Sequence, residues 1–452
     1  MEKASAAPPL HIVMDTYSSK ADLANNGSRE DLDPYVPADH RPQGSNTSSF
    51  GALAHLLKAS LGSGILAMPL AFRNAGILVG SVGTVVVGLV CAHALHILVK
   101  TSQELCVEAR RPCVGYADTC DLVFQYGPKS IRKFAPIARE VADWALAVTH
   151  LGACCVYIVV VAESFKQVSD SYGGPDWPVT VYCALTLVPL VPLTQITKLK
   201  YLVPFSAFAN VVWLVSIGIS VYYCLTDVPS LNERDLATSL SGIPLFVSTC
   251  LFAMEGVGVV MPVENEMERP QQFLGCPGVL NIAMSAVVVL YGFIGFFGYL
   301  KYGDEVRGSL TLNLPQDQVL AQTAKILVAL VMMLSYALIY YVPFDVVWRR
   351  LQGRVPAAAH RWAVAGIRLL GCLMTVGIAC AIPRLELFME LVGAVCLSVL
   401  GLLLPAVLET AWRWGRGPCK LLVCKNAVIV FFALLAMVSG VVYSIKGIVD
   451  HL

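Results

Sequence analysis

Eleven apolar runs, each close to the length of a membrane-spanning helix, constrain this chain more than any other feature of its sequence. A helix needs about 20 apolar residues to cross the hydrocarbon core of a bilayer. With 56% hydrophobic and 14% charged residues, the chain has more apolar surface than a soluble protein of 452 residues could bury. We therefore expect an all-α polytopic membrane protein. The runs lie at 50–73, 76–99, 139–165, 177–195, 202–225, 242–264, 278–301, 321–347, 362–382, 389–411 and 426–447.

The first and the sixth of these runs are each broken by a pair of glycines. Gly62 and Gly64 lie in the first run, Gly256 and Gly258 lie in the sixth, and a proline follows each pair within five residues. Backbone groups freed at that depth are tolerated only where they face protein or a watery cavity, and a ligand can then use them. Broken helices in corresponding positions of two halves point to the binding site of a secondary transporter.

The spacing of the two breaks also predicts how the helices are arranged. Because the breaks lie five helices apart, two five-helix repeats would enter the membrane from opposite sides, and the eleventh helix would follow them. This arrangement resembles that of leucine-transporter-like carriers, with a five-plus-five inverted repeat and breaks in helices 1 and 6. We expect a single transmembrane transporter domain over residues 50–447.

The uneven distribution of lysine and arginine predicts the orientation, because positive charge gathers on the cytoplasmic side. With a cytoplasmic amino terminus, the inner loops carry Arg110, Arg111, Lys129, Arg132, Lys133, Lys198, Lys200, Arg269, Arg349, Arg350, Arg354, Arg361, Arg413, Arg416, Lys420 and Lys425. The outer loops then carry only Arg73, Lys166, Arg234, Lys301, Arg307 and Arg384.

Two polar segments are expected on the cytoplasmic side. Residues 1–49 lack periodicity and are too poor in apolar residues to fold alone, so we interpret them as a disordered tail. Its glycosylation triplets at Asn26 and Asn46 should then stay unmodified. Residues 101–138 form the one long inner loop, punctuated by glycine and proline, and are expected to include a short surface helix.

The first break offers backbone donors for an anion. At Gly62, Ser63 and Gly64, the N–H groups at the start of the second half-helix would hold a substrate carboxylate, as helix amino termini hold anions. Such an end contributes about 0.3–2 kcal/mol for a nearby anion. The alternative is a small-residue face for helix packing. Packing glycines usually recur at four-residue spacing, whereas these lie two apart, which favours the binding site.

The second break offers acceptors for a cation. Unwound carbonyls around Gly256 and Gly258 suit a substrate ammonium. Glu255 has three alternative roles: it binds the ammonium, it takes a coupling proton, or it pairs with a group on a neighbouring helix. A carboxylate in mid-membrane costs about 2.5–3.5 kcal/mol and is therefore usually partnered or protonated.

His55 is the leading candidate to carry a coupling proton. It lies seven residues before Gly62, on the same helical face, and imidazole is the side chain most able to change charge near neutral pH. The alternative is a histidine that forms a structural hydrogen bond between helices.

Several uncommon strings, in the same order, resemble proton-coupled amino acid transporters of the animal amino acid/auxin permease family. HLLKASLGSGILAMPLAFRNAG at 55–76 is similar to the opening helix of that family, and FAMEGVGVVMPVENEM at 252–267 to its sixth helix. GSLTLNLP at 308–315 resembles the loop before helix eight, and IPRL at 382–385 and LVG at 391–393 resemble the ninth and tenth helices. The resemblance implies a symporter and also supports histidine at position 55 as the proton-coupling residue.

From these features we expect a proton-coupled symporter of small neutral amino acids that works by alternating access in the plasma membrane or a lysosomal or endosomal membrane. Its partners are the amino acids, protons and the lipid bilayer. One alternative is an amino acid sensor that reports occupancy to a nutrient-signalling complex with little flux. Another is a Na⁺-coupled carrier.

Several other classes of function lack their motifs. The sequence has no nucleotide-binding loop, no HExxH zinc site and no GxSxG nucleophile elbow, so neither a pump driven by ATP nor a membrane hydrolase is expected. The cysteines show no metal-ligand spacing. We predict no enzyme, no catalytic residue, no metal, no cofactor other than the coupling ion H⁺, and no nucleic acid partner.

Overall fold

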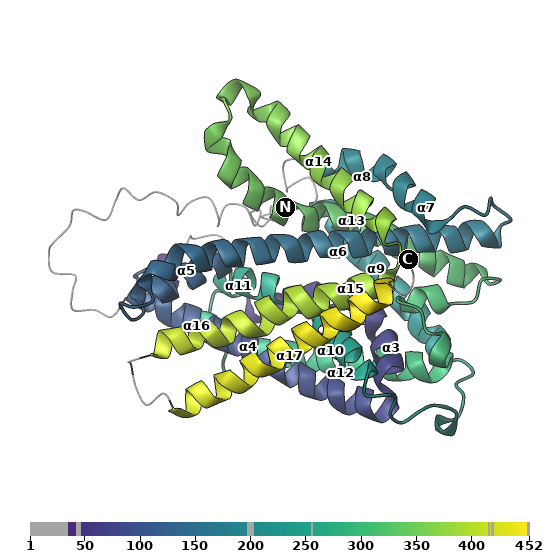
Figure 1. Ribbon diagram of the computed structural model, residues 1–452, viewed down its shortest axis with the longest axis horizontal. Helices are drawn as coiled ribbons and strands as arrows, with labels where there is room; N and C mark the ends of the chain where they lie inside the picture. Colours follow the sequence, from purple (N-terminus) through teal and green to yellow (C-terminus); the bar gives the residue numbers. More distant parts are fainter. Residues whose placement is uncertain are drawn as a thin grey trace, which may run out of the picture.

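The computed structural model describes residues 35–41, 47–196, 203–254, 256–414, 416 and 420–449. In this part of the chain all regular secondary structure is helical, apart from one isolated parallel bridge between Thr47 and Met267. The long helices run roughly along the long axis of the molecule (Figure 1). The described part thus has the all-α architecture that the apolar runs predict.

The helices coincide with the expected runs but extend beyond most of them. They are α2 (Ser49–Ser60), α3 (Gly64–Ala75), α4 (Ile77–Glu108), α6 (Ala135–Ser171), α7 (Val179–Leu185), α8 (Leu187–Thr194), α9 (Val203–Leu225), α10 (Gly242–Ala253), α11 (Val257–Asn265), α12 (Val279–Tyr302), α13 (Val319–Leu351), α14 (His360–Ala381), α15 (Leu385–Val392), the π-helix η10 (Gly393–Leu403), α16 (Leu404–Arg413) and α17 (Lys420–Val449). The long inner connection contains α5 (Tyr116–Tyr126), and the described tail contains the short η1 (Pro37–His40). Of the rest of the expected disordered tail, Tyr35, Val36, Arg41, Thr47 and Ser48 are described and Ser49 begins α2, while the other residues lie outside the described part of the chain.

Nine helices in the described part are long and apolar enough to cross a membrane, and the bent pair α2 and α3 raises this number to ten. The run at 177–195 forms the shorter pair α7 and α8, which begins after Pro178 and contains Pro192. Proline removes a backbone donor and interrupts a regular helix. The count of eleven spanning helices therefore stays a prediction.

Small residues let α3 pack deep inside the bundle, between α10 and α12. A methyl group on Gly295 of α12 would lie 2.4 Å from the Phe72 ring, and one on Gly298 would lie 2.4 Å from Pro69 Cγ. Phe72 and Pro69 are both fully buried in α3. The close approach of α12 to α3 therefore depends on the two glycines.

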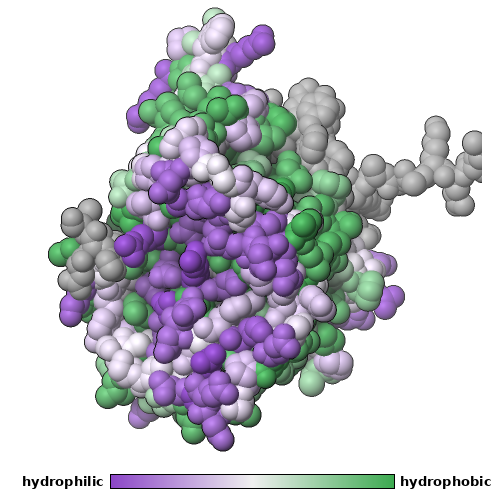
Figure 2. All heavy atoms as spheres, turned by 90° about the vertical axis from the view of Figure 1, so that its right-hand side faces the viewer, coloured by the Kyte–Doolittle hydropathy of each residue, from purple (hydrophilic) through white to green (hydrophobic). Residues whose placement is uncertain are grey.

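One end of the bundle differs from its sides (Figure 2). We call the end that carries α5 the α5 end and the opposite end, on the right in Figure 1, the far end. Hydrophilic side chains gather over the far end and hydrophobic ones at its edges (Figure 2). This distribution is typical of a multi-pass membrane protein whose ends meet water and whose sides meet lipid.

Candidate functional site

The first broken helix is bent by 54° between α2 and α3. Leu61 N–H donates to Leu57 O at 2.8 Å and closes α2, while Ile65 N–H and Leu66 N–H bond to Gly62 O and Ser63 O at 3.4 and 3.2 Å. Ser63 is the N-cap of α3, and its side chain makes no capping hydrogen bond. The amino terminus of α3 is thus left without a side-chain cap at the break, as an anion site requires.

The two glycines of this break differ in their surroundings. A methyl group on Gly62 would lie 3.7 Å from Ala59 O, an ordinary contact, and Gly62 is partly exposed. A methyl group on Gly64 would lie 2.5 Å from Cα and O of Ala253, the last residue of α10. Gly64 therefore lets the two broken helices approach each other closely, whereas Gly62 has room for a side chain and Ser63 is partly exposed. Gly64 thus serves helix packing, the alternative to a binding role, in addition to any role in binding.

The second break separates α10 from α11, directly beside the first. Met254 N–H donates to Cys250 O at 2.9 Å, and Gly256 O accepts from Val259 and Val260 N–H at 3.1 and 3.0 Å. Gly256 also lies close to the end of α2, because a methyl group on it would be 3.8 Å from Ser60 Oγ. Glu255 lies outside the described residues. The structure therefore brings the two glycine pairs together, as the sequence predicts.

His150 of α6 lines the second break. A methyl group on Gly258 would lie 3.4 Å from His150 Cε1 and 3.7 Å from Nε2. The other ring nitrogen, Nδ1, is 2.7 Å from Leu146 O. Because a carbonyl oxygen only accepts, Nδ1 carries a proton, and Nε2 remains toward the break with no hydrogen bond to a described residue. An ionisable side chain inside an apolar run was the sequence signal for this site.

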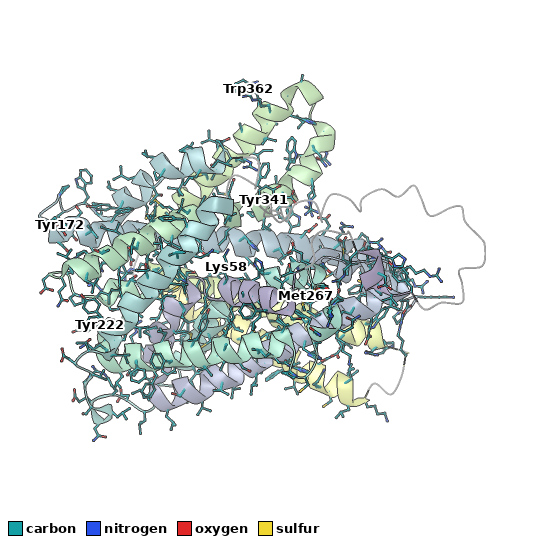
Figure 3. The ribbon with its side chains drawn as sticks, turned by 180° about the vertical axis from the view of Figure 1, so that it is seen from behind. Lys58, Tyr172, Tyr222, Met267, Tyr341 and Trp362 are labelled. Carbon is teal, nitrogen blue, oxygen red and sulfur yellow. The ribbon has the colours of Figure 1, made fainter. Side chains whose placement is uncertain are left out.

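His55 lies on an exposed side of α2 and makes no hydrogen bond or ion pair with a described residue. Seven residues of helix separate it from Gly62 by about 10 Å along the axis. Lys58, on the same segment, lies near the middle of the molecule in the view from behind (Figure 3). His55 is therefore on the approach to the break rather than in it, and its role in proton coupling stays a prediction.

Polar side chains of α3 make contacts at the far end, beyond the first break. Arg73 of α3 donates to Val306 O at 2.5 Å, and its guanidinium lies 3.8 Å from the Glu386 carboxylate of α15. Asn74 Nδ2 donates to Glu390 Oε1 at 3.2 Å, and Glu390 is only 4% exposed. These contacts tie α3 to α15.

The tail segment contacts the α5 end through Arg41. Arg41 lies 3.2 Å from the carboxylate of Glu264, which is only 2% exposed at the end of α11. Its guanidinium also donates to Glu264 O at 2.8 Å and to Pro112 O at 3.1 Å. Gln103 of α4 donates to the same carboxylate at 2.9 Å. Arg41 thus joins the tail, α11 and the loop after α4.

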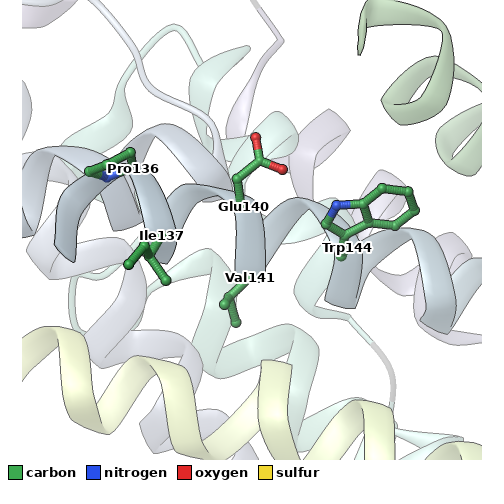
Figure 4. A pocket seen from close by; sticks show the side chains of 5 residues that line it. All are labelled: Pro136, Ile137, Glu140, Val141 and Trp144. Atoms are coloured by element: carbon green, nitrogen blue, oxygen red, sulfur yellow. The ribbon is translucent and has the colours of Figure 1, made fainter. Parts of the chain in front are cut away.

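A surface depression of about 490 Å³ lies elsewhere, along α6 near the α5 end (Figure 4). Its lining residues are Pro136, Ile137, Glu140, Val141 and Trp144. All five belong to one helix, and none belongs to either break. In a membrane protein such an apolar helix face meets lipid, so we place the functional site at the breaks and not at this depression.

Comparisons with known proteins agree with this architecture. The family model described as transmembrane amino acid transporter protein matches residues 45–446. The chain is 38% identical over 434 residues to the Drosophila melanogaster proton-coupled amino acid transporter-like protein pathetic, covering 95% of this chain and 91% of that protein. It is 24% identical over 408 residues to the Caenorhabditis elegans protein skat-1, covering 89% of this chain and 88% of that protein.

Two solved structures share the fold. They show Mhp1, a nucleobase-cation-symport-1 family transporter, in a closed conformation with bromovinylhydantoin bound and in an inward-facing conformation. The first matches with a TM-score of 0.50 at 14% identity and covers 88% of this chain and 91% of that chain. The second matches with a TM-score of 0.54 at 13% identity and covers 95% of each chain. The expected transporter fold is confirmed, and the protein belongs to the family of transmembrane amino acid transporter proteins.

Proposed function

We propose that this amino acid transporter carries small neutral amino acids together with protons, by alternating access around the two breaks. The observation that carries the proposal is the meeting of an uncapped helix amino terminus at Gly62 and Ser63 with the carboxyl end of α10, where the last carbonyl groups have no partner within the helix. The first suits a carboxylate and the second an ammonium group, so the pair matches the backbone of an amino acid. The small residues around the first break leave room for a compact substrate.

The two ends of the bundle supply the gates. At the far end, Arg73 and Asn74 tie α3 to α15, and at the α5 end, Arg41 ties the tail to α11. Both contacts hold the half-helices that lead to the site, α3 and α11. Opening one end requires its polar contacts to break while those at the other end persist. This is the exchange that alternating access needs.

Proton coupling is supported by the 38% identical Drosophila relative, which is named a proton-coupled amino acid transporter-like protein, and by the histidines near the site. One pH unit is worth about 1.4 kcal/mol, and 100 mV is worth about 2.3 kcal/mol per charge. One proton per cycle can therefore concentrate a neutral solute by tens to hundreds of times.

Uptake by the purified protein in proteoliposomes tests the proposal. An inward proton gradient should drive accumulation of a small neutral amino acid, and replacing Na⁺ with choline at constant pH should leave it unchanged. A loss of uptake in choline would instead show Na⁺ coupling. Saturable binding without accumulation would favour a sensor that reports occupancy to a signalling complex.

The orientation that we propose, with a cytoplasmic amino terminus, predicts a glycosylation pattern. An acceptor site engineered at Leu231, in the loop between α9 and α10, should receive a glycan in cells. Asn26 and Asn46 should stay bare. The measurement is a mobility shift that an endoglycosidase reverses. A glycan on Asn26 or Asn46 would instead show the opposite orientation, with the amino terminus away from the cytoplasm.

The contact between Arg41 and Glu264 predicts a change in thiol reactivity at the α5 end. Burial raises the pKa of the nearby Cys113 thiol, and the Arg41 guanidinium acts in the opposite direction. Glu264→Gln leaves a buried guanidinium without its ionic partner, which typically costs about 3–5 kcal/mol, so the tail should detach. Cys113, which is partly exposed in the folded protein, then becomes more accessible to water. Because burial is the largest cause of its raised pKa and outweighs the lost Arg41 charge, its pKa falls toward the ordinary value, and its labelling by maleimide at neutral pH should speed up several-fold.

Peptide mass spectrometry would follow Cys113 separately from the other thiols. The matched control is Glu140→Gln, because Glu140 pairs with Arg350 at 2.6 Å at the same end of the bundle and away from the tail. Equal labelling rates in wild type and Glu264→Gln would show that this contact does not hold the tail.

A further inference from the structure

Basic side chains that the transport site does not use gather at the α5 end, where α16 packs against both α4 and α17. His93, His96 and Lys100 follow one face of α4 at helical spacing, and Lys425 approaches from α17. Glu409 of α16 and Lys425 lie within electrostatic range of both imidazoles. The five side chains therefore form one group, which we call the α4–α17 cluster.

The charges of this cluster are not balanced among the described residues. Lys425 Nζ lies 2.8 Å from Glu409 Oε2, and this pair neutralises the only carboxylate of the cluster. Lys100 makes no ion pair or hydrogen bond with a described residue. Neither imidazole is hydrogen-bonded to a described residue either. His93 and Lys100 are exposed and His96 is half-buried, so an ammonium and two imidazoles remain available to an acceptor.

The depth of the cluster matches the boundary between headgroups and acyl chains. Lys100 lies eight residues before the end of α4, and Lys425 lies five residues after the start of α17. At about 1.5 Å per residue, both lie about 8–12 Å inside the helix ends. Exposed apolar side chains continue from the cluster toward the bilayer centre: Leu89 of α4 is 65% exposed, and Phe431 of α17 is 68% exposed.

We propose that the α4–α17 cluster binds an anionic phospholipid. Its phosphate lies against Lys100, His93 and His96, and its acyl chains run along Leu89 and Phe431. Charge complementarity and the apolar continuation together favour a lipid over a soluble anion, which has no use for the apolar track. Basic pockets between membrane helices on the cytoplasmic side are suited to anionic headgroups. Only the assignment to the cytoplasmic leaflet depends on the orientation proposed above.

Native mass spectrometry of the full-length protein in mixed phosphatidylglycerol and phosphatidylcholine tests this site. Wild type should retain phosphatidylglycerol preferentially. His96→Gln with Lys100→Gln should lower this preference at least fivefold, because a basic residue near the membrane surface is worth about 1 kcal/mol and two donors are lost. The matched control replaces Lys129 and Lys133, two exposed lysines at the same end, with glutamine and should keep the preference.

Two further measurements keep the test decisive. His93→Lys adds a charge to the cluster and should raise the preference for phosphatidylglycerol, even if the glutamine variant folds poorly. Glycerol phosphate in solution should not displace the lipid, and displacement would show a site for a soluble phosphate instead. An unchanged preference in both cluster variants, or an equal loss in the Lys129 and Lys133 control, would overturn the proposal.

Discussion

Gly62→Val should abolish saturable amino acid binding while the protein stays folded and in its membrane. A first methyl group at Gly62 would meet only Ala59 O at 3.7 Å, so the backbone around the break has no steric reason to move. The valine side chain would instead fill the space in front of the α3 amino terminus, where we place the substrate carboxylate. We expect a loss of affinity of at least about 100-fold, which is about 2.7 kcal/mol.

Binding of a radiolabelled amino acid to the purified variant measures this loss, and thermal unfolding of the same sample reports its fold.

Gly258→Val should act at the second break in the same way, since its side chain would press on His150, whose Cε1 is only 3.4 Å from an added methyl group. Gly64→Ala serves as the contrast. Its methyl group would meet the Ala253 backbone at 2.5 Å, so this variant should lose thermal stability and abundance. Wild-type affinity in Gly62→Val would remove the first break from the substrate site.

The breaks could be predicted from the sequence because they depend on local chemistry. Two glycines and a proline interrupt a helix wherever they occur, and the spacing of five runs between the pairs follows from counting apolar segments. The structure accordingly places the ends of α2 and α10 at Ser60 and Ala253. The difference between Gly62 and Gly64 could not be predicted, because it depends on which glycine meets the backbone of α10.

The contacts that we propose as gates are long-range, and the sequence carries little information about them. Arg41 and Glu264 are 223 positions apart, and Asn74 and Glu390 are 316 positions apart. A single sequence shows that these residues are polar but not that they meet. The π-helix η10 was also missed, since its residues follow the same apolar pattern as an α-helix. Its wider turn lets Leu400 O accept from Tyr116 of α5 at 2.7 Å.

His150 shows what a single sequence leaves open about an ionisable residue in an apolar run. Such a position indicates either a structural or a functional role, and the structure adds that the ring lies beside Gly258 at the second break. His55 presents the opposite case. Its helical face and the family resemblance support a role in coupling, and the structure leaves it exposed on α2. Both residues must therefore enter the same experiment.

His55→Ala should lose proton-driven accumulation while it retains substrate binding and exchange. The imidazole is exposed and makes no hydrogen bond to a described residue, so its removal should not lower abundance. The groups that hold the carboxylate and ammonium lie at the breaks, about 10 Å further along the helix. Uptake by wild type should rise as the external medium becomes more acidic, because histidine is the side chain that gains charge in that range. The alanine variant should show a flat profile and no proton current induced by substrate.

His150→Asn is the matched variant at the second break. The asparagine amide can still donate to Leu146 O, as Nδ1 does at 2.7 Å, but it cannot titrate. We expect this variant to keep the proton current and to bind substrate more weakly, since it loses only a group that faces the break.

Uptake against external pH, normalised to protein in the membrane, and the substrate-induced current measure both variants. A normal profile and current in His55→Ala would remove His55 from the mechanism. Loss of current in His150→Asn would then assign the proton to His150, and its persistence in both variants would assign it to Glu255.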